Sequence, residues 1–556
     1  MLLTRSFLSL LLPCLATVTV VPSAAADRLP NANHIFAAIH SSMRQFGSSL
    51  NHNGMSFFIA TVPEGTEFYH GTSKRERVNG IEWLAFEPEH AMIFARPGRG
   101  RRRPGGPGRG PPGKGMGHPD LKRGGPPDLE KREESDKFGP LFAYQGAFES
   151  PPTKEEKDKS YGYLHTYRTT TPLRLLYLDG QSAAKSSKGT LDAQDLVLLP
   201  GLIDPDVGMG GDKQRADEMC RIARESGAWK GRVDGVLRME GGFEVILCGF
   251  GERLDIVSIK RAKESNGHGP PGSDGDNGDG FNYYRAVAAR YDGIGGGRVT
   301  LDYEHFVTAF TFPDAMYWDH TGRPRIRNET EAKEEVERVT QAVTQMILNE
   351  ETKGNSVDWQ GVVDMIIQRY ADRIEYLASG HFTTLEAFQA EVDRALRPFI
   401  DYGARNGTLE VERCAAQFIP SDADTTTTAY LATTQIAHHI CSTLSSALST
   451  SSLSSALGLL QDLKSNLGWT TWKRCRGCDA HEICFLPIWP VGREEDFVQP
   501  RCRGNVSLGP GQEGGYWDGG FGRPPRGPGK PVWGRKEGEG EGVGVGSEQL
   551  NEEEEG

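Results

Sequence analysis

Residues 66–95 read TEFYHGTSKRERVNGIEWLAFEPEHAMIFA, and this stretch decides the interpretation of the first half of the chain. It contains two short segments, YHGT at 69–72 and the apolar WLAF at 83–86, that read as half-buried strands. A later run, GFEVILC at 242–248, carries one carboxylate, Glu244, among apolar neighbours. Such a carboxylate is costly to bury unless it is paired or functional. Taken in this order, the three segments predict a nucleotide-binding cleft.

The first half of the chain mixes the periods of strands and helices. In order, the patterns predict a helix over 34–46, an extended segment over 56–61, two extended segments within 163–178, an amphipathic helix over 212–227 and a buried strand over 243–250. The helix over 212–227 places Ala216, Met219, Cys220 and Ala223 on one face. The mixture favours an α+β domain over residues 27–315 rather than a doubly wound parallel sheet.

Residues 326–468 have a different character. Apolar residues recur there at intervals of three and four, which predicts a helical domain with helices over 332–350, 357–378, 384–402 and 427–467. Cys414 and Cys441 lie in this region, and we expect a disulfide to join them. The chain length of 556 residues also exceeds one ordinary core and indicates several domains.

Residues 469–504 form a small cysteine-rich module. Its cysteines are spaced Cys475-x2-Cys478-x5-Cys484-x17-Cys502. Disulfides are the favoured interpretation, because an exported chain meets an oxidising compartment. Tetrahedral zinc binding by four thiolates is the alternative, although the spacing lacks a second close pair. We therefore predict disulfides and no metal site.

Residues 1–26 have the layout of a cleavable secretory signal, with one arginine, an apolar stretch and small residues at the end. No later segment approaches the apolar length that spans a bilayer, so we expect a secreted, extracellular protein. Of nine cysteines, Cys14 leaves with the signal, and the even remainder suits disulfides. Asn328, Asn406 and Asn505 begin N-glycosylation acceptor triplets, which indicates surface loops of a glycoprotein.

Two segments have compositions that cannot bury an apolar core. The net charge of −12 is unevenly distributed along the chain. Residues 97–136 are rich in glycine, proline and arginine, whereas the segment 505–556 finishes in a run of glycine and glutamate. Both are predicted to be disordered. Dibasic pairs at 122–123 and 131–132 make proteolytic nicking during secretion a hypothesis for the basic insert. Polyanion binding through 97–136 is the less favoured interpretation, because no aromatic side chains lie among its arginines.

The order of the three segments quoted first resembles the ADP-ribosyltransferase fold, in its branch with a histidine, an aromatic residue and a glutamate. The resemblance covers residues 66–250 and is interrupted by the basic insert. It implies that His70 hydrogen-bonds a ribose hydroxyl of NAD and that the backbone of Gly71 holds the nicotinamide amide. Thr72 completes this motif and is counted with the NAD-binding positions.

The same resemblance implies an aromatic ring that stacks on nicotinamide and a glutamate on the third strand. The family usually supplies a tyrosine for the ring, and here the counterparts are Trp83, Phe86 and Phe94. Glu244 stands at the glutamate position. Cleaving the bond between nicotinamide and ribose builds positive charge on the sugar, so a preplaced carboxylate stabilises the transition state more than the ground state.

The sequence therefore predicts a secreted protein with NAD as cofactor that transfers or hydrolyses ADP-ribose, with His70 and Glu244 as catalytic residues. The competing hypothesis is a non-catalytic secreted protein whose domains recognise a partner or a cell wall. The Ser/Thr-rich stretch 425–454 and the low-complexity ends suit that class. The chain lacks the Gly-x-Ser-x-Gly elbow of hydrolases and the Gly-Lys-Ser/Thr ending of a P-loop, so neither motif supports a different catalytic centre.

Overall fold

A computed structural model of the chain describes residues 28–97, 161–203, 211–225, 227–263, 279–290, 297–349, 356–504 and 516–517. All of them belong to one compact unit, Met1–Gly520. The predicted signal segment, nearly all of the basic insert and most of the C-terminal tail lie outside the described residues. The predictions for those three segments therefore stay predictions.

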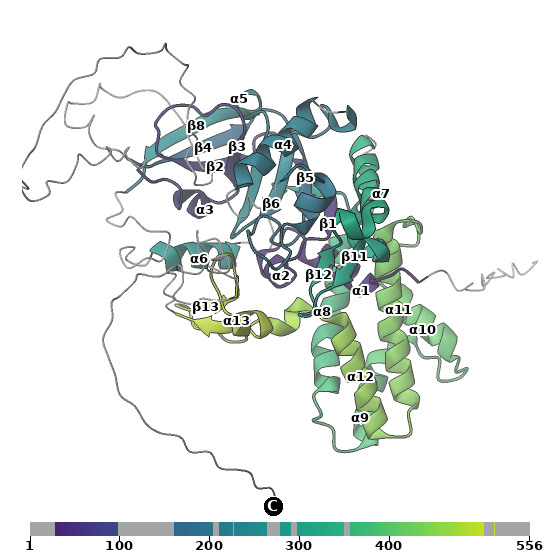
Figure 1. Cartoon of the computed structure of the whole chain (residues 1–556). Helices are drawn as coiled ribbons and strands as arrows, with labels where there is room; N and C mark the ends of the chain where they lie inside the picture. Colours follow the sequence, from purple (N-terminus) through teal and green to yellow (C-terminus); the bar gives the residue numbers. More distant parts are fainter. Residues whose placement is uncertain are drawn as a thin grey trace, which may run out of the picture. The chain divides into compact units, whose positions relative to one another are not determined.

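A ten-stranded sheet forms the centre of the first half of the chain (Figure 1). Its strands are β1 (Ser56–Val62), β2 (Glu67–Thr72), β3 (Glu82–Ala85), β4 (Tyr163–Thr169), β5 (Leu173–Leu178), β6 (Gly235–Met239), β7 (Phe243–Leu247), β8 (Leu254–Arg261), β9 (Thr300–Leu301) and β10 (Val307–Thr308). The spatial order is β10-β1-β5-β6-β7-β3-β2-β4-β8, and β9 pairs with β1. Among the described strands, β5 and β6 run parallel and the other pairs of this sheet run antiparallel.

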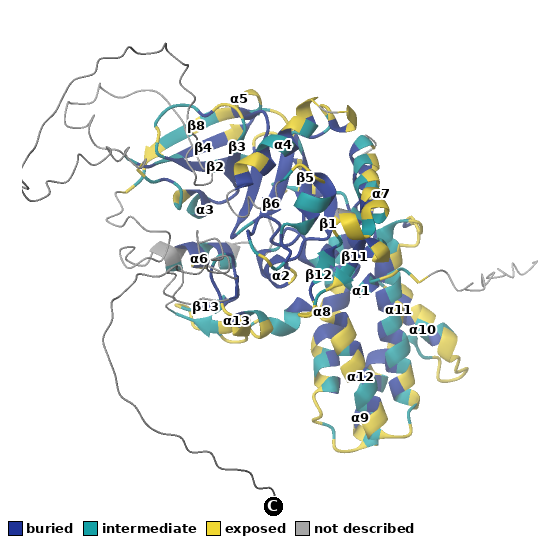
Figure 2. Cartoon of the chain, viewed as in Figure 1, coloured by how far each residue is buried: buried dark blue, intermediate teal, exposed yellow. Residues whose placement is uncertain are grey.

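Helices and a hairpin accompany the sheet. They are α1 (Ala32–Ser41), α2 (Gln45–Leu50), α3 (Pro88–Met92), η1 (Ala193–Leu198), α4 (Asp212–Glu225), η3 (Gly227–Trp229), α5 (Phe250–Arg253), α6 (Asp279–Arg290), η4 (Ala309–Thr311), η5 (Pro313–Ala315), β11 (Met316–Trp318) and β12 (Pro324–Ile326). The strands β6 and β7 are buried along their whole length, and apart from Arg238 and Glu244 their residues are apolar, as in strands covered on both faces. Figure 2 shows the central strand β6 in dark blue. The α+β class predicted for this half is confirmed.

The local predictions for this half are largely confirmed. The predicted extended segments correspond to β1, β4 and β5, and α4 buries the four predicted apolar residues. The helix predicted over 34–46 is wrong as one element, because the chain breaks between α1 and α2. Met43 has a φ of 55° there, in the left-handed region that ends a right-handed helix.

The second half of the chain is helical, as predicted. Its helices are α7 (Glu329–Leu348), α8 (Trp359–Ala378), α9 (Leu385–Leu396), η6 (Arg397–Phe399), α10 (Gly407–Ala416), α11 (Thr428–Ser449) and α12 (Leu453–Leu467). The helix predicted over 427–467 is wrong as one element. The serine Ser452 caps α12 by accepting a hydrogen bond from the backbone N–H of Ser455, so a new helix begins there.

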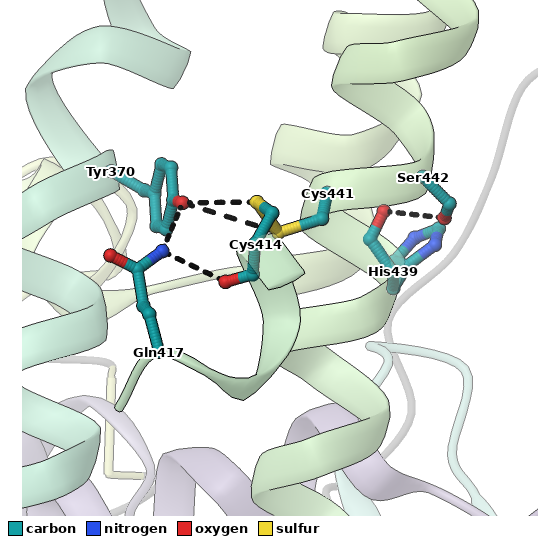
Figure 3. Close-up of a disulfide and its surroundings, with 6 residues drawn as sticks. All are labelled: Tyr370, Cys414, Gln417, His439, Cys441 and Ser442. Atoms are coloured by element: carbon teal, nitrogen blue, oxygen red, sulfur yellow. Dashed lines mark hydrogen bonds between the residues drawn. A yellow bond between two sulfur atoms is a disulfide. The ribbon is translucent and has the colours of Figure 1, made fainter. Parts of the chain in front are cut away.

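A disulfide between Cys414 and Cys441 joins α10 to α11, which confirms the predicted pair. Both cysteines are buried. Figure 3 shows the hydroxyl of Tyr370 directed at the bridge, with its oxygen 3.4 Å from Sγ of Cys414. The side chain of Gln417 in turn donates a hydrogen bond of 3.1 Å to that hydroxyl. The disulfide therefore joins α10 to α11, and the hydroxyl of Tyr370 adds a buried polar contact from α8.

The cysteine-rich module contains η7 (Thr470–Lys473), β13 (Ile483–Phe485), α13 (Glu494–Val498) and β14 (Arg501–Arg503). Its disulfides are Cys475–Cys484 and Cys478–Cys502, and a further disulfide, Cys220–Cys248, joins α4 to the end of β7. The sulfur atoms of Cys475, Cys478 and Cys502 lie within 4.8 Å of one another. Because these sulfurs are paired in disulfides, they present no thiolates for the zinc alternative.

The helix α1 connects the two halves of the chain. It contacts both α8 and α11, and the side chains of Arg44 and His40 bind the carboxylate of Asp364 on α8. One hydrophobic cluster of buried residues runs from the sheet into the helical region. The domain boundaries stay predictions, and every described helix is too short or too polar to cross a bilayer.

Candidate functional site

Three neighbouring strands carry the residues that the sequence singled out. In the sheet, β3 lies between β2 and β7, so the predicted motif strands are adjacent. Tyr69 pairs with Ala85, and Ala85 pairs with Glu244. Directly paired residues share one face of a sheet, and these three side chains therefore form a row across it. The small side chain of Ala85 leaves space in the middle of the row.

A small cavity of about 10 Å³ lies over this row. It is lined by Tyr69, His70, Gly71, Trp83, Leu84, Ala85, His90, Ala91, Phe94 and Glu244. The structure thus brings five predicted positions to one place: His70, Gly71, Trp83, Phe94 and Glu244. A cavity needs roughly 10–15 Å³ to hold a water molecule, so this one is water-sized.

Glu244 supplies a buried carboxylate to the cavity. Its side chain is 3% exposed, and Nε of Arg238 donates a hydrogen bond of 2.9 Å to Oε1. Burial raises the pKa of Glu244 to about 7, because it outweighs the opposing effect of Arg238, and the carboxylate of Glu240 raises the pKa further. The structure thus excludes an exposed edge position for this carboxylate.

Arg238 organises the buried charges behind Glu244. It is fully buried on β6, directly opposite Glu244, and its guanidinium also donates to Asp212 and Gln194 at 2.9 Å. The ammonium of Lys185 lies 3.0 Å from Glu240 and 3.4 Å from Asp212. Burial would raise the pKa of Asp212, but the two cations outweigh it and lower that pKa to about 2.

Sequence reasoning missed this set of charged residues. Arg238 was the available signal, because a single arginine in the otherwise apolar segment GVLRM requires a buried partner. Lys185 lies in a loop, and Asp212 lies at the start of α4. Both are separated from Arg238 in the sequence. Their approach to Arg238 depends on the tertiary fold, and no local pattern reveals it.

His70 is buried, and its ring lies on the opposite face of the sheet from Glu244. Successive side chains of a strand alternate between faces, so His70 points away from the face that carries Tyr69. Nδ1–H of His70 donates to the backbone carbonyl of Trp83 at 2.8 Å, and its ring lies 5.7 Å from that of Phe250. Burial lowers the pKa of His70 to about 3, so the ring is neutral. This geometry separates the imidazole from the carboxylate of Glu244.

Gly71 is required because the backbone of the end of α3 and of the residues that follow it lies directly against β2. A Cβ atom at this position would lie 1.9 Å from the carbonyl oxygen of Ala91 and 2.7 Å from the nitrogen of Ala95. The resemblance implies that Gly71 contacts a nicotinamide amide. In this structure, residues 91–95 of the chain occupy that side of Gly71 and close the cavity.

The other predicted positions divide between the cavity and the core. Trp83 shares the face of Glu244, because it pairs with Ile246 on β7. Phe86 is buried against Phe68 with ring centroids 4.7 Å apart, and it does not line the cavity. Thr72 is also buried and outside the lining, and its hydroxyl accepts a hydrogen bond from the backbone of Lys74.

Among the buried polar atoms of the lining residues, Nε1 of Trp83 and Nε2 of His90 have no hydrogen-bond partner within the described residues. The other ring nitrogen of His90, Nδ1, lies 3.1 Å from the hydroxyl of Tyr283, which ties α3 to α6. Burial lowers the pKa of His90 to about 4, so its ring is neutral. Unpaired buried polar groups are rare and call for a physical reason.

Comparisons with known proteins cover the same part of the chain. Residues 26–268 match a family model described as the YPL277C N-terminal domain. The uncharacterized protein YOR389W of Saccharomyces cerevisiae is 32% identical to this chain over 248 residues. The uncharacterized protein YPL277C of the same organism is 32% identical over 249 residues. Each match covers 42% of this chain, and the chain spans 34% and 44% of the lengths of these relatives. No solved structure matches the chain.

The matched segment contains every residue that lines the cavity and all four charged residues behind Glu244. It ends before α6 and the helices α7 to α12. The names of these relatives state no activity. The chemistry of the site is therefore argued from its own residues.

Proposed function

We propose that the cavity is the closed form of an NAD-binding site and that the protein transfers or hydrolyses ADP-ribose. One observation carries the proposal: the buried carboxylate of Glu244 lines the same cavity as Trp83 and His90, and each of these two rings has a buried nitrogen without a hydrogen-bond partner among the described residues. A carboxamide has both a donor and an acceptor, so it matches an N–H of Trp83 and a ring nitrogen of His90. The carboxamide of nicotinamide is such a group.

The residues fit nicotinamide in their chemistry, whereas the closed volume does not. A cavity that holds benzene measures about 150 Å³, far above the volume of this cavity. Residues 88–95 must therefore move away from β2 before a ring enters. This segment contains only the short helix α3, and one of its side chains, Met92, is 39% exposed to solvent. Both features favour such a movement.

When bound, NAD supplies a pyridinium leaving group on the ribose. The Glu244 carboxylate, in its ionised form, stabilises the positive charge that develops on the sugar. Arg238 holds Glu244 in place through Nε, and Trp83 and Phe94 provide aromatic walls. The ribose contact that the resemblance implies for His70 is not part of this proposal, because its ring lies on the other face.

The test is NAD binding and nicotinamide release by the full chain, compared with a Glu244→Gln variant. Glutamine keeps the shape and an acceptor for Arg238 but removes the charge. We expect release to fall by about 10²–10³-fold, the effect of losing one preorganised electrostatic group. The control is Glu67→Gln on β2, because that carboxylate is 39% exposed and lies outside the cavity.

A wild-type chain that neither binds NAD nor releases nicotinamide would contradict the proposal. That result favours the second candidate, a non-catalytic secreted binding protein. The observation in favour of this second candidate is that the cavity is closed and water-sized, so it does not admit a nicotinamide ring as it stands. Calorimetry with NAD separates the two candidates, because the second one predicts no heat of binding for either variant.

A further inference from the structure

A second cavity, of about 210 Å³, shares no lining residue with the first. It is enclosed by α1, the loop after α2, the hairpin of β11 and β12, and two residues of the cysteine-rich module, Lys473 and Phe497. Its volume exceeds the roughly 150 Å³ that accommodates a benzene ring. The space therefore suits one ring with a small substituent.

Aromatic rings line two sides of this cavity. The imidazole of His34 stacks on Phe310 with centroids 5.2 Å apart and lies 4.5 Å from the ring of Trp318. Burial lowers the pKa of His34 to about 4, so this ring is uncharged and continues the aromatic wall. Phe497 lines another side. Such walls favour a flat apolar ligand over a strongly hydrated one.

Positive charge is in excess at the cavity. The guanidinium of Arg323 is 6% exposed and forms an ion pair with the exposed Glu494 at 3.6 Å. It also donates hydrogen bonds to the side chains of His52, Thr321 and Tyr516. The ammonium of Lys473 donates to the backbone carbonyl of Phe497 at 2.8 Å. No carboxylate among the described residues forms an ion pair with Lys473. Lys473 is therefore a partly buried cation without a carboxylate partner among the described residues, which is costly, and a bound anion would offset that cost.

The acidic residue of the lining does not supply this anion. Oδ1 of Asp179 accepts hydrogen bonds from the backbone nitrogens of Met55 and Ser56, so it is directed at β1. Burial also raises the pKa of Asp179 to about 7, which keeps this carboxyl largely protonated below that pH. Asp179 therefore does not neutralise Lys473, and the carboxylate of a ligand would do so.

We propose that this cavity binds a small aromatic carboxylate. The ring lies between the wall of Phe310 and Trp318 and the ring of Phe497, and the carboxylate accepts hydrogen bonds from Lys473 and Arg323. The proposal does not depend on NAD chemistry, because no residue is common to the two cavities.

The experiment is calorimetric titration of the full chain with phenylacetate, with acetate and benzyl alcohol as probes that carry only the charge or only the ring. We expect phenylacetate to bind more tightly than either probe. In Lys473→Met, which keeps the apolar stem, phenylacetate affinity should fall by about tenfold to a hundredfold, because one charged hydrogen-bond donor is lost. The matched control is Lys333→Met, whose lysine is 65% exposed and lies outside the cavity.

A second variant protects the test against a folding artefact. Trp318→Ala removes part of the ring wall at a side chain that is 41% exposed, so the fold should survive. It should weaken phenylacetate and leave the weak acetate affinity unchanged. Failure of phenylacetate to bind the wild-type chain, equal binding by Lys473→Met, or acetate binding as tight as phenylacetate overturns the proposal.

Discussion

Arg238 is the residue on which the buried charges of the first cavity depend. Its guanidinium contacts Glu244, Asp212 and Gln194, and it has no exposed surface. Two buried carboxylates and the partly buried carboxylate of Glu240 share this region with two cations. Removing one cation leaves buried carboxylates without a compensating charge. The resulting loss of folding free energy is far larger than the loss on breaking a surface ion pair.

Replacing Arg238 by Met is therefore expected to lower the free energy of unfolding by about 3–5 kcal/mol. Urea unfolding of the full chain measures this change. The matched control is Arg338→Met, which breaks the exposed pair with Glu335 and should cost about 0–1 kcal/mol. Equal losses in the two variants would show that the Arg238 pairs contribute no more than surface contacts.

At the scale of elements, the contact between α3 and β2 decides whether the first cavity is open. Gly71 allows this contact, because any side chain there meets the backbone of residues 91–95. The hydrogen bond between His90 and Tyr283 holds α3 from the other side. The cavity is thus closed by one short helix with two attachments.

Gly71→Ala is expected to push α3 away from β2 and to destabilise the chain by about 1–3 kcal/mol, as overpacking does. Hydrogen exchange of residues 88–95 should become faster. The control is Gly458→Ala in α12, where nothing lies within 4 Å of the added Cβ. That substitution should stabilise by about 0.5–1 kcal/mol, because alanine favours a helix. Unchanged exchange in Gly71→Ala would argue against α3 as the closing element.

The elements also show where sequence reasoning succeeds and where it stops. The segments β1, β4, β5, β7 and α4 follow from local periodicity, which depends only on the chain's own residues. The end of α1 at Met43 and the new start at Ser452 do not, because periodicity continues across both. The row of Tyr69, Ala85 and Glu244 depends on strand register, and so does the opposite placement of His70. Register is set by long-range pairing, which one sequence does not reveal.

At the scale of the whole molecule, buried titratable groups give stability an unusual dependence on pH. Burial lowers the pKa of five histidines to about 3 or 4, namely His34, His52, His70, His90 and His165. Burial raises the pKa of three carboxyls to about 7, namely Glu82, Asp179 and Glu244. The two sets act in opposite directions.

Below about pH 6.5 the unfolded chain protonates its histidines, whereas the folded chain keeps them neutral, so stability rises with pH through that range. The raised carboxyls hold extra protons in the folded chain between about pH 4.5 and 7, so each of them makes stability fall as pH rises there. Because the histidines outnumber the carboxyls, we expect a maximum near pH 6.5 and a small decline up to about pH 8.

Thermal melting of the full chain between pH 4.5 and 8 measures this profile. Asp179→Asn should reduce the decline above the maximum, since asparagine keeps the acceptor for Met55 and Ser56 but has no proton to lose. A melting temperature that is constant from pH 4.5 to 6.5 would contradict the profile.

The position of α1 has a consequence for how the protein is made. The backbone of Leu29, just before α1, donates to the side chain of Gln435 on α11, 406 residues later in the chain. A ribosome adds roughly 5–20 residues per second, so this partner emerges on the order of 20–80 s after α1. During that interval the apolar face of α1 lacks the helix that covers it. Of the described helices, the first to be synthesised is therefore among the last to gain all its contacts, and a chain released before α11 displays that face to chaperones and proteases.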